Sequence, residues 1–312
     1  MTPTREGAYH EPVMAGEIVD LLRSAKTVLD GTLGGGGHSE ALLEAGVRLV
    51  IGVDRDPEAI AAATKRLAPF TAQGRFRAVR ANYADVAGSP AIEGALDGVL
   101  LDLGVSSHQL DDEARGFTFR EGAVLDMRMG DAAATAAEFL NDSDERTLAA
   151  ALRDYGDEPR AGRLAREIVR RRATAAFATS DDLVNAIRGA LGPKTGPGDF
   201  ARIFQAVRIA VNDELSGLAQ ALPALRDAMA PGGVMAVITY HSGEDRLVKH
   251  TFREWSTDCV CPPRQPRCTC GGRSLGEVLT RRAVLPSDEE RERNPRARSA
   301  KLRAWRKAGA GA

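Results

Sequence analysis

Long apolar runs, net charge and cysteine are all scarce in this sequence of 312 residues. No stretch reaches the roughly 18 apolar residues that a membrane-spanning helix needs, and no apolar run follows the basic residue near the amino terminus. We therefore expect a soluble, cytoplasmic protein that does not bind a membrane. The net charge is -1, so binding to an acidic polymer would depend on local basic patches rather than on a global field.

The few cysteines lie in one short stretch with the spacing C-x-C-x6-C-x-C: Cys259, Cys261, Cys268 and Cys270. This crowding argues against a distributed disulfide framework and is compatible with a tetrahedral thiolate site for zinc. A reduced cysteine cluster or an oxidisable loop would show the same spacing, so the sequence leaves zinc open.

The order of apolar patterns predicts the fold class. Between residues 26 and 102, apolar runs alternate with helical periods, which indicates βαβ units and a parallel sheet. From 111 to 198 only helical patterns appear, and the α/β pattern then resumes with a long helix over 204–230, a strand over 234–240 and a final antiparallel strand over 301–306. We expect a Rossmann-like α/β fold with a mostly parallel sheet, split by an inserted helical subdomain. The predicted boundaries are 1–110, 111–198 and 199–312.

Acidic residues end three of the predicted strands, at Asp30, Asp54 and Asp102. In open α/β sheets, ligands bind outside the carboxyl ends of the strands. The three aspartates are therefore expected to face one shared crevice.

A glycine-rich loop, DGTLGGGGH, follows the first predicted strand from Asp30 to His38. Its glycines, Gly36 and Gly37 among them, let the backbone approach a ligand closely. At the end of the next strand, Asp54 can accept hydrogen bonds from both ribose hydroxyls of a nucleoside cofactor. The pair fits NAD and S-adenosylmethionine alike, but the polar Asp30 and His38 suit the amino-acid end of a methyl donor better than a pyrophosphate.

Later strand ends offer further candidates. Tyr83 could stack on an adenine, although an edge tyrosine is an equally good interpretation. Asp102 could accept a hydrogen bond from a target amine, hold it in line with the donor and take its surplus proton. His241 is a second candidate acceptor for that proton, against the alternative that it belongs to a helix-capping network with Ser242 and Glu244.

Several separate motifs resemble the bacterial 16S ribosomal RNA (cytosine-N4)-methyltransferases, in the right order over nearly the whole chain. They are DGTLGGGGH at 30–38, DRDP at 54–57, LDLGVSS at 101–107, QLDD at 109–112, LDMRM at 125–129, FQAVRI at 204–209, VNDEL at 211–215 and NPRARS at 294–299.

The resemblance implies transfer of a methyl group from S-adenosylmethionine to N4 of cytidine 1402 in 16S ribosomal RNA, within the decoding region of the small ribosomal subunit. It implies that the donor is contacted by Gly36, Gly37, His38, Asp54, Tyr83, Asp102 and Gln109. Members of the family lack the four cysteines, so a zinc site would have a structural role only.

Other interpretations stay open beside this one. The chain could methylate another nucleic acid, although the helical insert with its arginines favours a large structured RNA. It could also be a catalytically silent RNA-binding protein, although such a protein would have a broken donor pocket and this one is intact. Within that insert, Arg163, Arg166 and Arg170 share one helical face and are candidates for RNA contact. Whether the protein forms a homodimer is not decided by the sequence.

Overall fold

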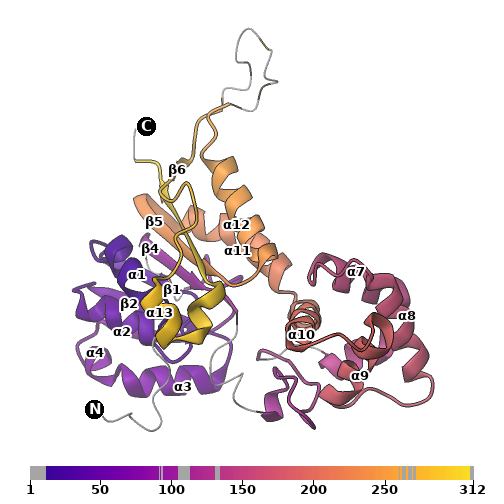
Figure 1. Cartoon of the computed structure of the whole chain (residues 1–312). Coiled ribbons are helices and arrows are strands. Elements are labelled where there is room, and N and C mark those ends of the chain that lie inside the picture. Colours follow the sequence, from indigo (N-terminus) through magenta and orange to yellow (C-terminus); the bar gives the residue numbers. More distant parts are fainter. Residues whose placement is uncertain are drawn as a thin grey trace. The chain divides into compact units, whose positions relative to one another are not determined.

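The computed structural model describes residues 12–90, 92, 94–104, 113–130, 134–259, 261, 265, 269 and 272–309. Its contacts divide the chain into two compact units, the first formed by Met1–Gly104 with Gly217–Ala312 and the second by Val105–Ser216. The first unit contains the sheet and the second is helical (Figure 1). The predicted Rossmann-like α/β fold with a helical insertion is therefore confirmed.

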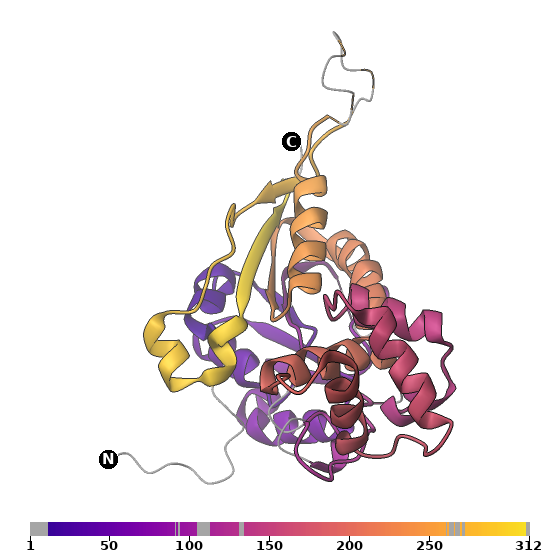
Figure 2. The ribbon, with the colours of Figure 1, turned by 45° about the vertical axis from the view of Figure 1, so that its right-hand side comes forward.

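The sheet has seven strands in the order β3-β2-β1-β4-β5-β7-β6. Strands β1 to β5 pair in parallel, and β7 runs antiparallel to both of its neighbours. The final strand, yellow in Figure 2, thus lies in the sheet as the antiparallel strand that was expected over 301–306. The strand bounds are β1 Thr27–Asp30, β2 Leu49–Asp54, β3 Phe76–Arg80, β4 Leu96–Asp102, β5 Met229–Thr239, β6 Gly276–Val278 and β7 Lys301–Lys307.

Helices cover both faces of this sheet because neighbouring strand residues point to opposite sides. Val28, Val50 and Leu100 join one core with α1 and α2, whereas Leu29 and Val99 join the other core with α11 and α12. In this unit the helices are α1 Ala15–Leu22, α2 Gly37–Glu44, α3 Pro57–Arg66, α4 Ala68–Ala72, α11 Glu214–Ala228, α12 Ser242–Trp255 and α13 Asp288–Arg293, with a 3-10 turn at Pro295–Ser299.

The helical unit has a core of its own, in which Leu140, Leu164, Ile187 and Phe204 are buried. Its elements are a 3-10 turn at Glu113–Arg115 and the helices α6 Ala136–Asp142, α7 Glu145–Asp154, α8 Ala161–Arg172, α9 Ser180–Leu191 and α10 Pro197–Asn212. The unit extends past the boundary expected after Gly198, because the apolar face of α10 is part of this core.

The single long helix expected over 204–230 is wrong, because the chain forms α10 and α11 with a break at Asp213. Asp213 adopts the left-handed conformation, with a φ of 50°. Just before it, the Asn212 side chain accepts a hydrogen bond from Met129 N at 2.8 Å and donates one to Met127 O at 2.8 Å. These contacts hold the end of α10 to the loop before α6.

None of the helices in the described part of the chain is long and apolar enough to span a membrane.

Candidate active site

The carboxyl ends of β1, β2 and β4 bring Asp30, Asp54 and Asp102 together, as the strand pattern predicts. β1 lies between β2 and β4, so the sheet order reverses at β1 and β4, where the crevice of an open α/β sheet forms. The three carboxylates are electrostatically coupled: the charge of Asp30 acts on both Asp54 and Asp102.

Asp30 is buried and holds the start of the glycine loop. Its Oδ2 accepts a hydrogen bond from the Ser39 hydroxyl at 2.7 Å, and its Oδ1 accepts one from Thr32 N at 3.3 Å. Burial raises the pKa of Asp30, against the opposing effects of His38 and of these two donors. Its contacts therefore fix the loop between β1 and α2.

Asp54 ties the glycine loop to the end of β2. Its Oδ2 accepts a hydrogen bond from Gly34 N at 2.9 Å, and its Oδ1 accepts one from Asp56 N at 2.9 Å. Burial raises the pKa of this carboxyl, and the nearby charges of Asp56 and Asp30 add to the effect. Each carboxylate oxygen has a further lone pair for a ligand hydroxyl.

The glycines of the loop are needed for more than one reason. Gly34 has a φ of +49°, and a Cβ there would meet only Thr32 O at 4.0 Å, so the loop borders open space beside Asp54. Gly36 has a φ of +78° and would press a Cβ against Ala63 at 3.2 Å. These positions favour glycine through backbone conformation and packing.

This arrangement fits the ribose of a nucleoside cofactor. The Asp54 carboxylate at the end of β2 can accept hydrogen bonds from ribose hydroxyls, and the Gly34 N–H holds it beside open space. Tyr83, partly buried, packs against the residues at the end of β1, since a Cβ on Gly31 would lie 3.1 Å from the Tyr83 Cβ.

Asp102 is held by contacts from three other elements. Tyr240, directly after β5, donates its hydroxyl to Asp102 Oδ1 at 2.7 Å. His38, in α2, places Nδ1 at 3.7 Å from Asp102 Oδ2. The backbone N–H of Asp102 donates to the Thr32 hydroxyl oxygen at 2.6 Å. Burial raises the pKa of Asp102 to about 6.

The His38 ring is buried, and both of its nitrogens lie near other groups of the protein. Nε2 lies 2.8 Å from Val13 O, and Nδ1 lies 3.7 Å from Asp102 Oδ2. The structure therefore places the imidazole among side chains and backbone of the site. Direct contact between this residue and a methyl donor stays a prediction.

His241 takes part in the capping network that sequence reasoning offered as its alternative role. It is the N-cap of α12, where its Nδ1 accepts a hydrogen bond from Glu244 N at 3.3 Å. Glu244 in turn accepts hydrogen bonds from the backbone of Tyr240 and His241. A catalytic role for His241 stays a prediction beside this structural one.

Two sets of predicted residues fall wholly or partly outside the described residues. Gln109 lies outside them, as do Cys268 and Cys270. Cys259 is exposed and its sulfur accepts a hydrogen bond from Cys261 N at 3.4 Å. The described residues alone contain no cluster of three or more His, Cys, Asp or Glu side chains suited to a metal ion.

Sequence reasoning did not identify Tyr240 or Thr32 as site residues. Both were visible as polar side chains at strand ends, Tyr240 after β5 and Thr32 after β1. What was missing was the pairing of β4 with β5, which sets Asp102 opposite Ile238 and so brings Tyr240 into reach.

Comparison with known proteins decides the family. A model of the MraW methylase family matches residues 7–308. The chain belongs to the MraW methylase family. The resemblance recognised from its motifs is thereby confirmed.

Curated relatives match over the whole length. A protein of Gemmatimonas aurantiaca named Ribosomal RNA small subunit methyltransferase H is 63% identical, over 99% of this chain and 100% of the relative. A protein of the same name from Heliobacterium modesticaldum is 47% identical, over 96% and 98%. Among solved structures, an rRNA methylase from Streptococcus thermophilus matches with a TM-score of 0.42 and 9% identity over 94% and 93% of the two chains, a likeness too distant to support a conclusion.

Proposed function

We propose that this chain transfers a methyl group from S-adenosylmethionine to the exocyclic N4 of cytidine 1402 in 16S ribosomal RNA of the small subunit. The observation that supports it best is the intact crevice, in which Asp54 and Asp102 end β2 and β4, the two strands that flank β1, in a fold belonging to a methylase family. The names of the full-length relatives support ribosomal RNA as the substrate class.

In this proposal Asp54 binds the ribose hydroxyls of the donor, and the glycine loop with Gly36, Gly37 and His38 lies along its amino-acid end. Tyr83 lies near the adenine. The family resemblance adds Gln109, which lies outside the described residues. When bound, the donor supplies an electrophilic methyl group on a sulfonium. The protein supplies position, since Asp54 already fixes the loop through Gly34 N.

Asp102 is proposed to act on the target amine. The lone pair of the cytosine NH₂ is delocalised into the ring, so the enzyme has to orient that group by accepting its N–H. The ionised carboxylate only accepts hydrogen bonds. Once N4 has gained the methyl group, one N–H bond breaks, the electron pair stays on nitrogen, and the proton leaves to Asp102, to water or to His241.

We propose that the helical unit recognises the RNA, with the exposed face of α8 as the contact. Arg163 and Arg166 are exposed there, and within the part of the chain that the structure describes neither makes an ion pair. Arg170 is less available, because it pairs with Glu167 at 2.7 Å. Hydrogen bonds from Arg170 and Arg171 lower the pKa of Glu167 to about 2.

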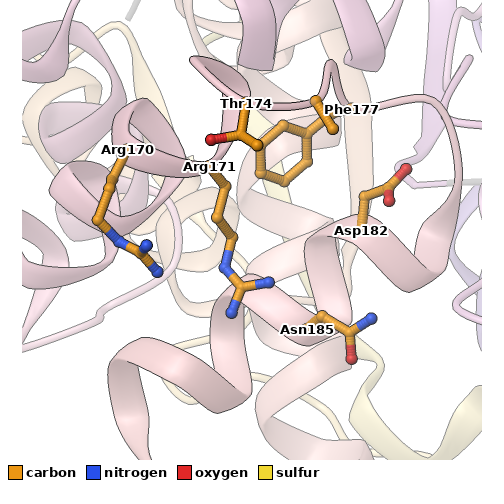
Figure 3. Close-up of a pocket in the computed structure, with 7 residues that line it drawn as sticks. Arg170, Arg171, Thr174, Phe177, Asp182 and Asn185 are labelled. Carbon is orange, nitrogen blue, oxygen red and sulfur yellow. The ribbon is translucent and has the colours of Figure 1, made fainter.

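Beside this face lies a cavity of about 330 Å³ (Figure 3). Arg170, Arg171 and Asn185 lie around it, and the Phe177 ring lies between Arg171 and Asp182 in the view of Figure 3. Phe177 is buried in the core of the helical unit, so the groups that this cavity offers a nucleotide are the guanidinium groups, which suit a phosphate. The cavity therefore supports a role for this unit in RNA contact.

The proposal is tested by incubating the protein and S-adenosylmethionine with unmethylated 30S subunits and, separately, with free 16S RNA, followed by nucleoside mass spectrometry. N4-methylcytidine is the expected product. Methylation of DNA only would support another nucleic-acid substrate, and RNA binding without any product would indicate a silent RNA-binding protein. Calorimetry with S-adenosylmethionine and with NAD separately identifies the cofactor.

A further inference from the structure

The carboxylate of Asp102 is held at both oxygens by side chains from different parts of the sheet unit. We propose that Tyr240 and His38 are positioning residues, which fix the orientation of Asp102 and keep it in its proton-accepting form for the target amine. The proposal rests on the function proposed above, in which Asp102 meets that amine.

The backbone on either side of Asp102 is fixed first. Its N–H donates to the Thr32 hydroxyl oxygen at 2.6 Å, and the next residue, Leu103, donates its N–H to Ile238 O at 2.9 Å. These bonds join the end of β4 to β1 and β5. The carboxylate then has only its side-chain torsions left to fix.

Tyr240 fixes Oδ1. Its hydroxyl donates at 2.7 Å, and its ring packs over Gly104, where a Cβ would lie 3.3 Å from Tyr240 Cδ2. Gly104 also has a φ of +107°, which favours glycine. The Tyr240 ring therefore packs on the backbone at Gly104, directly after β4, and its hydroxyl points at Asp102.

His38 faces Oδ2, and its other nitrogen determines its tautomer. Nε2 lies 2.8 Å from Val13 O, and a carbonyl can only accept, so Nε2 bears a hydrogen. In the neutral ring Nδ1 then has a lone pair, which would face a second acceptor at 3.7 Å. The two atoms are too far apart for a hydrogen bond, and His38 acts on Asp102 through its charge, which lowers the pKa of that carboxyl.

Burial and the other charged groups around Asp102 raise its pKa, and so oppose the effect of His38 and Tyr240. Asp30 from β1 and Glu244 from α12 raise the pKa of Asp102, as does burial, whereas His38 and the Tyr240 hydroxyl lower it. Glu290 of α13 acts on Tyr240, whose own pKa is raised well above 10 chiefly by burial, so its hydroxyl keeps its proton and donates. Removing either the Tyr240 hydroxyl or the His38 ring should therefore raise the pKa of Asp102 further.

The test is the pH dependence of turnover in Tyr240→Phe, which removes one hydroxyl and keeps the ring. Loss of a hydrogen bond to a charged group should move the acid limb of the kcat profile to higher pH by about one unit or more, with little change in KM for S-adenosylmethionine. His38→Gln, which removes the ring that lowers the pKa of Asp102, should move it the same way. Tyr155→Phe, the same substitution in the helical unit, should leave the acid limb in place.

A second readout needs no substrate. Carbon-13 NMR of labelled aspartate carboxyls, with the Asp102 signal assigned by its loss in Asp102→Asn, should show a titration midpoint near 6 that moves upward in Tyr240→Phe. An unmoved midpoint would overturn the positioning role even in an active enzyme. If the wild type yields no N4-methylcytidine but the midpoint still moves in Tyr240→Phe, the proposed function is overturned and the positioning role of Tyr240 stays supported.

Discussion

Asp102→Asn should make the protein more stable at neutral pH while it removes most of the activity. The carboxyl of Asp102 has a folded-state pKa of about 6, against 3.8 for the free group, because burial disfavours its charge. The folded state therefore holds this proton more tightly than the unfolded chain does. The stability of the wild type falls as pH rises through the window from about 4 to about 6, and stays lowered above it.

The magnitude follows from the width of that window. A difference of about 2 pKa units corresponds to about 3 kcal/mol at pH values above both pKa values. Asparagine does not ionise and keeps the shape of the side chain, and its carbonyl can accept the hydrogen bond from Tyr240. The variant should gain up to about 3 kcal/mol at pH 7.5 and lose this advantage near pH 4.

Turnover should change in the opposite direction. The NH₂ of the target cytosine would meet a donor in place of an acceptor, and loss of such a preorganised partner typically costs about 10²- to 10³-fold in kcat. Urea unfolding at several pH values, together with methylation kinetics, measures both effects. A variant that is equally destabilised at pH 5 and pH 7.5 would refute the burial argument. A kcat within about twofold of wild type would leave Asp102 as a donor-binding residue only.

Three further changes test other parts of the account. Asp54→Ala should weaken S-adenosylmethionine binding strongly in calorimetry, because two ribose hydroxyls lose a charged acceptor at about 1.5 to 3 kcal/mol each and Gly34 N loses its partner; an unchanged Kd would refute the ribose assignment. Arg163→Glu with Arg166→Glu should lower RNA affinity and flatten its salt dependence, with donor binding intact. Cys259→Ser with Cys261→Ser should leave methyl transfer unchanged, and a loss of turnover on this change would contradict a purely structural role for the cysteines.

The arginine pair has a matched control in the sheet unit. Arg23 and Lys65 are both exposed, so Arg23→Glu with Lys65→Glu makes the same change in net charge in the other unit. If both double variants flatten the salt dependence equally, the effect comes from total charge and α8 is only a solvated face.

The parallel strands could be predicted because each is a short apolar run that ends in a polar residue. β1, β2 and β4 therefore carry Asp30, Asp54 and Asp102 to one edge, and this depends only on the parallel order of the strands. The helical character of 111–198, where α8 and α9 lie, could also be predicted, since apolar faces repeat there with the period of a helix.

Contacts between distant segments could not be predicted from local patterns. The bond between Tyr240 and Asp102 joins residues 138 positions apart and depends on the register of β4 with β5. The break at Asp213 is similar, because a left-handed aspartate inside a helical pattern becomes favourable only when Asn212 is bound to the loop at Met127 and Met129.

The proposed reaction methylates one particular amine of the small-subunit RNA. The most direct test is to treat unmethylated 30S subunits with the protein and S-adenosylmethionine bearing an isotopically labelled methyl group, and to map the label by mass spectrometry of RNase fragments. We expect the label in N4-methylcytidine at position 1402, and its loss with Asp102→Asn. Label at another position, or on the ring carbon or ribose of the same cytidine, would contradict the proposed reaction. Undiminished label with Asp102→Asn would contradict the proposed role of Asp102.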